Sequence, residues 1–190
     1  MKYNKITQLS KGWSSYIWLV RDTRGREFVL KEVREKSPRK DLAEREGKML
    51  SLANTVSVGP RVQEINFKEN FVVMEYVRGA KVFDWIVSEE FEKVSAEQLW
   101  NFIKSLYKQL LALDTIGLSH NQLPIGKNIL VREKVLGGEK VFVPVIIDFE
   151  KATLKPNGNT RNIGQIESFL FYNPNGIVAK KVREKFKANL

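Results

Sequence analysis

The apolar residues change their spacing partway along the chain, and this change most limits the fold. Up to residue 76 they form short strand-like runs with one helical stretch, at residues 41–54, between two pairs of them. From residue 95 to residue 116 apolar residues instead recur every three and four positions, as on one face of a long amphipathic helix. The pattern predicts a sheet with one helix, followed by a mainly helical part.

Local signals mark where several of these elements begin and end. Asp41 and Ser95 are side chains that commonly cap helix N-termini, and each precedes a helical stretch. Gly117 ends the long helical stretch, since glycine readily adopts the positive φ of a helix end. Residues 129–136 and 141–147 flank two glycines and predict a second hairpin.

Composition excludes several classes of chemistry. The chain has 190 residues and no cysteine, which removes disulfides, thiolate nucleophiles and cysteine-ligated metal sites. His120 is the only histidine, so histidine-rich metal sites are excluded as well. No run approaches the roughly 18 apolar residues of a membrane-spanning helix, and the first residues lack a signal-peptide core. We therefore expect a soluble, cytoplasmic protein without a membrane partner.

The chain is strongly basic, with 32 Lys and Arg against 22 Asp and Glu and a net charge of +10. Such a surface favours anionic partners, among them RNA, phosphates and acidic proteins. Two basic stretches, residues 34–40 and 179–187, are either ordinary solvated faces or an RNA-facing patch. Many charged residues without cysteine are also typical of a heat-adapted, thermophile protein.

The first part of the chain combines three features that suit a bound polyphosphate. A small-residue turn at residues 10–15 enters a hairpin, the second strand of the hairpin ends at Lys31, and Glu46 follows on the helical stretch. A triphosphate carries concentrated negative charge, which backbone N–H groups and a fixed ammonium can hold. A surface ion pair would be the alternative reading of the lysine and glutamate if they stood alone.

The second part of the chain carries a further pair of motifs. Residues 118–131 contain His120, a leucine and Asn128, and then run into an apolar strand. The second predicted hairpin ends in the sequence Asp148-Phe149-Glu150.

Taken in order, these motifs resemble those of a protein kinase over residues 7 to 170. The nearest class is that of the small, atypical archaeal-type Ser/Thr kinases similar to the RIO and KEOPS-complex kinases, because only 40 residues follow Glu150. The resemblance implies an α+β, two-lobed fold. An antiparallel sheet with one helix would form the N-lobe, 1–78, and a reduced helical C-lobe would take 79–190.

The resemblance also implies an ATP site. The turn residues Gly12, Ser14 and Ser15 would cover the phosphates, and Lys31 would contact the α and β phosphates. Glu46, rather than Glu44, would pair with Lys31, because an apolar residue follows it one turn later, as in the family.

In the same scheme Met74 would guard the back of the adenine pocket, and residues Glu75 to Val77 would form the hinge. Asn128 and Asp148 would bind Mg²⁺. The resemblance therefore implies ATP and Mg²⁺ as cofactors.

Three residues near these motifs receive individual expectations. Lys127 is a spare cation that we expect near the γ-phosphate, with a solvated loop lysine as the alternative. His120 is expected to hold the loop by packing rather than to carry a proton. Glu150 stands where the family has glycine, and we expect a surface residue there rather than a metal ligand.

The chain departs from the family at three places. The catalytic Asp falls on Gln122, which cannot accept a proton as a carboxylate does, although it can orient a hydroxyl. The Asp that braces the catalytic loop in the family falls on Asn162, so the loop is expected to be held by amides. Of the three glycines of the phosphate loop, only Gly12 is present.

Three functions remain open at this point. The first is an ATP- and Mg²⁺-dependent Ser/Thr protein kinase that phosphorylates a protein substrate or itself, with Gln122 orienting the acceptor. The second is a pseudokinase, a nucleotide-binding regulatory or RNA-associated module. The third is a phosphotransferase acting on small molecules or RNA, which the loss of the catalytic Asp disfavours.

Overall fold

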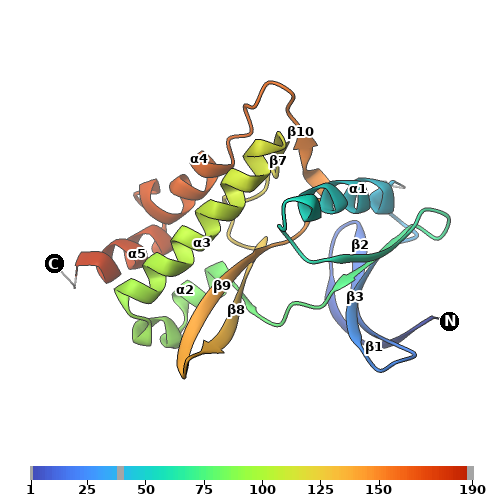
Figure 1. Ribbon diagram of the computed structural model, residues 1–190, viewed down its shortest axis with the longest axis horizontal. Helices are drawn as coiled ribbons and strands as arrows, with labels where there is room; N and C mark the ends of the chain where they lie inside the picture. Colours follow the sequence, from blue (N-terminus) through green and yellow to red (C-terminus); the bar gives the residue numbers. More distant parts are fainter. Residues whose placement is uncertain (1, 38–40, 188–190) are drawn as a thin grey trace. The chain divides into compact units, whose positions relative to one another are not determined.

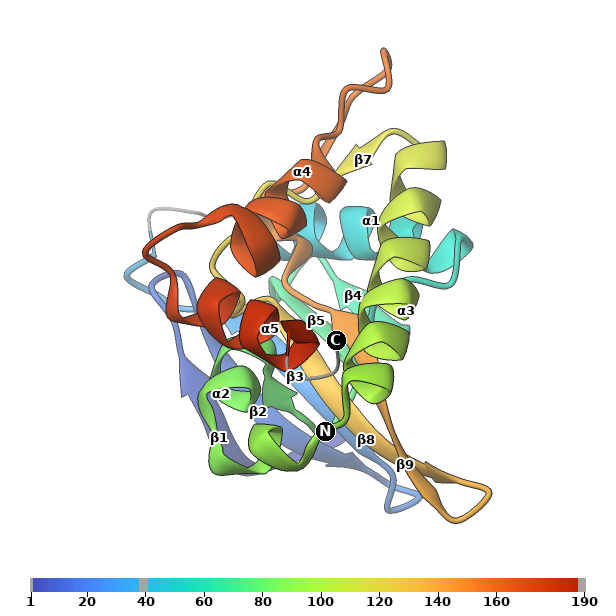
Figure 2. The same ribbon diagram turned by 90° about the vertical axis from the view of Figure 1, so that its left-hand side faces the viewer.

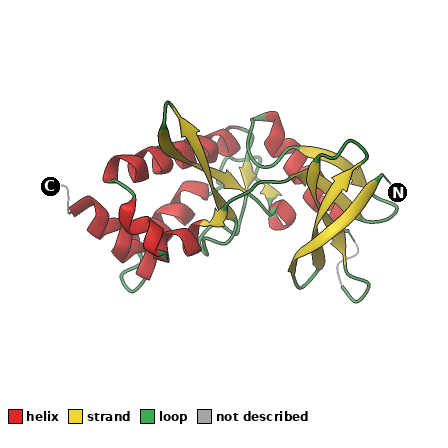
Figure 3. Ribbon diagram, turned by 90° about the horizontal axis from the view of Figure 1, so that it is seen from below, coloured by secondary structure: helices red, strands yellow, loops and turns green. Residues whose placement is uncertain are grey.

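The computed structural model describes residues 2–37 and 41–187, which form two compact units. The first unit lies within Met1–Tyr76 and also includes Asp148–Lys151, while the second consists of Val77–Ile147 and the residues from Ala152 onward. Figure 3 shows that strands dominate the unit carrying the N-terminus and helices the unit carrying the C-terminus. The described residues have the predicted α+β fold.

The first unit is built on a five-stranded antiparallel sheet with the strand order β1-β2-β3-β5-β4 (Figure 1). The strands are β1 (Tyr3–Lys11), β2 (Ser15–Asp22), β3 (Glu27–Val33), β4 (Val62–Asn66) and β5 (Phe71–Glu75). Helix α1 (Leu42–Thr55) packs against β3, β4 and β5. A buried cluster of Val20, Phe28, Leu30 and Val73 forms part of the core of this unit.

Strand β1 was not predicted from the sequence. Its residues are mostly polar and exposed, so it lacks the alternation of apolar and polar residues that marks a half-buried strand. It forms at the edge of the sheet through backbone pairing with β2, and that pairing is interrupted by two register shifts. The sequence had indicated only a turn before residue 16.

The start of α1 also differs from the expectation. Asp41 occupies the N-cap position, but its side chain makes no capping hydrogen bond. The backbone N–H of Ala43 is instead satisfied by Oδ1 of Asn70, at 2.9 Å, from the turn between β4 and β5. The cap is thus supplied from a distant part of the sequence, which a local pattern cannot indicate.

The second unit combines helices with a long hairpin. Its helices are α2 (Val82–Val87), α3 (Ala96–Thr115), α4 (Asn162–Glu167) and α5 (Ile177–Lys187), with a 3-10 turn at Glu89–Lys93 and a π-helical turn at Ser168–Tyr172. Its strands are β6 (Ala80–Lys81), β7 (Leu118–Ser119), β8 (Ile129–Leu136), β9 (Glu139–Ile146) and β10 (Thr153–Leu154). Figure 2 shows α5 beside α2, and these two helices are in contact.

Helix α3 is the central element of the second unit, and its predicted ends are confirmed. Ser95 and Gln98 form a reciprocal capping box at its start. Gly117 follows its end with φ of 65°, and a Cβ there would lie 2.9 Å from the carbonyl oxygen of Lys155. The apolar face of α3 is buried and packs against β9 and α4.

Hairpin β8–β9 holds the end of the loop at residues 120–128. Asn128 precedes β8 and Ile147 follows β9, and the Ile147 N–H donates to the Asn128 carbonyl oxygen at 2.9 Å. The hairpin therefore fixes the end of this loop against the end of β9. In the described part of the chain, no helix is long and apolar enough to cross a membrane.

Candidate functional site

Lys31 lies in β3 of the first unit and is surrounded by carboxylates. Its Nζ donates to Oε2 of Glu46 at 2.9 Å and to Oδ1 of Asp148 at 2.6 Å, and lies 3.5 Å from Oε2 of Glu150. Only 7% of the lysine side chain is exposed. The structure therefore pairs Lys31 with Glu46, as the sequence predicted, while Glu44 lies exposed beside Lys48.

The charges of this cluster act on the pKa values of Lys31 and Glu46. Burial by itself would lower the pKa of Lys31, but the charges of Glu46 and Asp148 outweigh burial and raise it. Burial raises the pKa of Glu46, and the Asp148 charge adds to this effect, while the Lys31 ammonium opposes it. Three carboxylates thus lie within 3.5 Å of the Lys31 ammonium.

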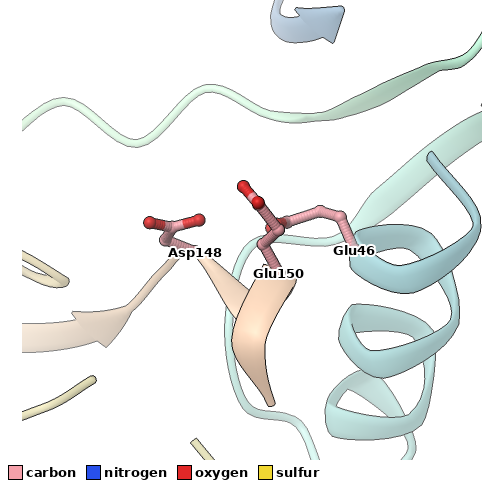
Figure 4. Close-up of side chains that lie close together, drawn as sticks. All are labelled: Glu46, Asp148 and Glu150. Atoms are coloured by element: carbon pink, nitrogen blue, oxygen red, sulfur yellow. The ribbon is translucent and has the colours of Figure 1, made fainter. Parts of the chain in front are cut away.

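The carboxylates themselves form a donor set suited to a divalent cation. One carboxylate oxygen from each of Glu46, Asp148 and Glu150 lies within 4.8 Å of the others. Figure 4 shows the three side chains together, with Glu46 on α1 and the other two on the segment that follows β9. Carboxylate oxygens are the ligands that Mg²⁺ prefers, so the chemistry of this donor set fits a magnesium ion, and Asp148 is the most accessible of the three carboxylates.

The segment at residues 148–151 begins with an unusual backbone conformation. Asp148 has φ of 67°, in the left-handed region that non-glycine residues seldom adopt. Phe149 is fully buried, and its N–H donates to Oε1 of Glu46 at 3.1 Å. The segment is thus tied to α1, and Glu46 binds Lys31 with one carboxylate oxygen and this segment with the other.

The predicted phosphate loop is a tight turn between β1 and β2. The Gly12 N–H donates to the Ser15 carbonyl oxygen at 2.9 Å, which closes the turn. Arg34 fixes the turn through two hydrogen bonds: its Nη1 donates to the Gly12 carbonyl oxygen at 2.9 Å, and its backbone N–H donates to the Ser14 carbonyl oxygen at 3.0 Å. The sequence suggested no such role for Arg34, which was counted only as part of a basic stretch; residues 38–40 of that stretch lie outside the described residues.

Ser14 joins this turn to the carboxylate cluster. Its hydroxyl donates to the Glu150 carboxylate, at 3.1 Å from Oε2 and 3.3 Å from Oε1. The expectation that Glu150 is a surface residue is therefore wrong, since only 7% of it is exposed. The Glu150 carboxylate is buried because it accepts a hydrogen bond and lies beside a cation, which together compensate its loss of water.

The predicted adenine-side residues lie at the end of β5 and just beyond it. Met74 is buried in β5, and the backbone N–H of Glu75 donates to the Arg61 carbonyl oxygen at 2.8 Å. Val77, which is also buried, begins the second unit. Their part in binding a nucleotide stays a prediction.

In the second unit, His120 is held from both ring nitrogens. Its Nε2 lies 2.9 Å from the Ile147 carbonyl oxygen, and the Gln122 N–H donates to its Nδ1 at 3.3 Å. Because Nδ1 accepts a hydrogen bond, Nε2 is the ring nitrogen that can donate to the Ile147 carbonyl oxygen. The side chain is fully buried, which agrees with the expected packing role.

The remaining loop residues are arranged around Asn128. Its Nδ2 donates to the Gln122 carbonyl oxygen at 3.2 Å, and Asn128 is buried. The Gln122 side chain is partly exposed, and Lys127 is exposed. The structure thus brings His120, Gln122 and Asn128 together in the second unit, as it brings Lys31, Glu46 and Asp148 together in the first.

The loop is braced by an amide, as predicted. Asn162 is fully buried at the start of α4, and its Oδ1 accepts from the His120 N–H at 2.9 Å. Its Nδ2 donates to the Leu118 carbonyl oxygen and to Oδ1 of Asp114, both at 2.8 Å. One neutral side chain therefore joins α3, α4 and the start of the loop.

Comparisons of the sequence with known proteins find a distant relative. No protein-family model matches the chain. Over 117 residues, which make 62% of this chain and 86% of the relative, the chain is 26% identical to the uncharacterized protein MJ1211 of Methanocaldococcus jannaschii.

A solved structure resembles the chain along nearly its whole length. The Rio2 kinase of Chaetomium thermophilum, in its ADP/Mg²⁺-phosphoaspartate complex, superposes with a TM-score of 0.69 over 96% of this chain, at 18% sequence identity. The chain spans 61% of that kinase chain. The chain therefore has a protein kinase-like fold.

Proposed function

We propose that this chain binds ATP with Mg²⁺ and transfers the γ-phosphate to a hydroxyl of a protein or of itself, as an atypical Ser/Thr kinase. One observation carries the proposal: Nζ of Lys31 is hydrogen-bonded to both Glu46 and Asp148. An ammonium fixed in this way, beside carboxylates of the kind that hold Mg²⁺, suits the binding of a polyphosphate. The Rio2 kinase of the same fold, with its ADP and Mg²⁺, adds support.

In this proposal the first unit holds the phosphates and the metal. Lys31 binds the phosphates, Glu46 fixes Lys31, and Asp148 binds Mg²⁺. The turn formed by Gly12, Ser14 and Ser15 covers the phosphates, while Met74, Glu75 and Val77 serve the adenine. When bound, Mg²⁺ would neutralise charge on the transferring phosphoryl group.

The second unit is proposed to supply the remaining groups. Asn128 is the second protein ligand for Mg²⁺, and Gln122 orients the acceptor hydroxyl. His120 positions the loop through its ring contacts, and Lys127 contacts the γ-phosphate. If Lys127→Ala changes neither ATP affinity nor turnover, that last role is excluded.

Gln122 sets the expected rate. Loss of a general base lowers a rate by about 10²–10⁴, whereas phosphoryl transfer depends mainly on positioning and charge neutralisation. We therefore expect slow but measurable transfer.

A second candidate function is a nucleotide-binding regulatory module without transfer. Gln122 favours it, because no carboxylate stands at the acceptor position, while Lys31 remains paired for nucleotide binding. An RNA-associated role has less support from α5: Lys181 pairs with Glu92, and Lys185 and Arg183 donate to carbonyl oxygens, so these charges are engaged in packing contacts.

The test is transfer of labelled γ-phosphate from Mg·ATP by the wild type, Asp148→Ala and Gln122→Ala, after a thermal-shift measurement of nucleotide binding. Labelling that Asp148→Ala abolishes supports the kinase. Stabilisation by ATP without any transfer supports the regulatory module. If ATP leaves the unfolding temperature unchanged and no label is transferred, both candidate functions are excluded.

A further inference from the structure

Glu150 makes the contacts that a bound phosphate would be expected to make. Its carboxylate accepts from the Ser14 hydroxyl in the turn between β1 and β2, at 3.1 Å, and lies 3.5 Å from Nζ of Lys31. A carboxylate and a phosphoryl group present similar anionic oxygens to such donors. The turn and the lysine proposed to hold phosphates are therefore already joined by an anion that belongs to the chain.

This anion is not needed to neutralise Lys31. The lysine already donates to Glu46 and Asp148 at shorter distances, 2.9 and 2.6 Å. One carboxylate oxygen of Glu150 also lies within 4.8 Å of one oxygen from each of Glu46 and Asp148. Like charges this close repel one another, so the contact between Glu150 and Lys31 is weaker than it would be without the other two carboxylates.

We propose that Glu150 is an internal competitor for the phosphate-binding position, which a nucleotide must displace from Ser14 and Lys31 in order to bind. The inference rests on the proposed nucleotide site and adds a residue that sets its affinity. After this displacement the Glu150 carboxylate still lies near the phosphate oxygens and repels them. The nucleotide must therefore bind together with a divalent cation that neutralises the charge of its phosphates.

A different role for the same residue predicts the opposite effect. If Glu150 instead helps to bind the metal of a metal–nucleotide complex, removal of its charge weakens nucleotide binding. If it competes with phosphate, removal of its charge strengthens binding. The sign of the change therefore separates the two roles.

The experiment measures ADP binding by titration calorimetry in Mg²⁺, because ADP binds without transfer. The wild type is compared with Glu150→Gln, which keeps the shape of the side chain, and with Glu150→Gly, which removes it. Glu69→Gln is the matched control, because Glu69 lies in the exposed turn between β4 and β5 and its loss changes the net charge equally. Thermal unfolding verifies that each variant is folded.

We expect both Glu150 variants to bind ADP more tightly, on the order of tenfold or more, as removal of an adjacent like charge predicts. The control should stay within about twofold of the wild type. In the nucleotide-free Glu150→Gly variant, the amides of residues 12–16 should exchange hydrogen faster, because the turn loses its tie through Ser14.

Two results overturn the inference and differ in what else they exclude. If the wild type binds ADP and both Glu150 variants bind it equally or more weakly, the internal competitor is excluded while the proposed nucleotide site stands. If no form of the protein binds ADP, the proposed function fails and the inference fails with it.

Discussion

Nζ of Lys31 donates a 2.6 Å hydrogen bond to Oδ1 of Asp148, although 117 positions separate these residues in the sequence. Both belong to the first unit, because the segment Asp148–Lys151 is part of it. Lys31 and its acidic partners therefore form one hydrogen-bonded network within the first unit.

Lys31→Met should strongly destabilise the protein. The change leaves the buried Glu46 carboxylate without its Lys31 partner, and removal of one partner from a buried ion pair costs about 3–5 kcal/mol. The measurement is the free energy of unfolding in urea. Lys48→Met is the control, since Lys48 pairs with Glu44 on the exposed side of α1 and should change stability by about 1 kcal/mol or less. Equal effects of the two changes would contradict the buried network.

Gln122→Asp should accelerate phosphate transfer. A carboxylate at this position supplies the missing general base, which is worth about 10²–10⁴ in rate. The measurement is the initial rate of γ-phosphate transfer under saturating Mg·ATP. Gln122→Asn keeps an amide and should show no acceleration. An unchanged rate in Gln122→Asp would mean that the acceptor is not activated from this position.

Asn162→Asp should weaken the fold, although it restores the residue that the kinase resemblance implies at this position. The new carboxylate can still accept from the His120 N–H, but it cannot donate to Leu118 and it faces the Asp114 carboxylate. Each unsatisfied buried group costs about 1–3 kcal/mol. We expect the loss in urea unfolding at pH 7 and a partial recovery near pH 4, where a protonated side chain donates again. A loss independent of pH would contradict the charge explanation.

Stability should fall in alkali through Tyr107. Burial, together with the nearby Glu167 charge, raises the pKa of Tyr107 to about 12, and its hydroxyl lies 3.2 Å from Oε1 of Glu167. Because the folded pKa exceeds the ordinary value of 10.0, the contribution of Tyr107 is complete below pH 10 and is lost as the pH rises towards 12. Urea midpoints between pH 8 and pH 12 should fall less in Tyr107→Phe than in the wild type. Tyr16→Phe, at a partly exposed residue of β2 in the first unit, is the control and should follow the wild type.

The sequence predicted those parts of the fold that local pattern determines. Helix α3, with its capping box at Ser95 and its end at Gly117, follows from apolar spacing and end signals. Strand β1 was missed because an exposed edge strand has no buried face to create a pattern. The N-terminal contact of α1 was missed because Asn70 supplies it from another turn.

The candidate site shows the same division. The pairing of Lys31 with Glu46 was predicted because these residues follow the order of motifs in protein kinases. The brace formed by Asn162 was predicted because this asparagine stands where the family has the bracing Asp. The contact of Ser14 with Glu150 joins residues that lie 136 positions apart in the sequence. Glu150 also stands where the family has glycine, so neither periodicity nor the resemblance indicates this contact. The sequence therefore left Glu150 outside the site, whereas its burial and its partners place it inside the cluster.

The division of the chain between its two units has a consequence for biosynthesis. The chain leaves the first unit after Tyr76, returns to it at Asp148 and leaves again after Lys151. A ribosome therefore releases the sheet and α1 long before it has made the segment that carries Asp148 and Glu150. Until then Lys31 has Glu46 as its one partner among these carboxylates, and the first unit lacks the buried Phe149. We expect the first unit to reach its final stability only after residues 77–147 of the second unit have been made.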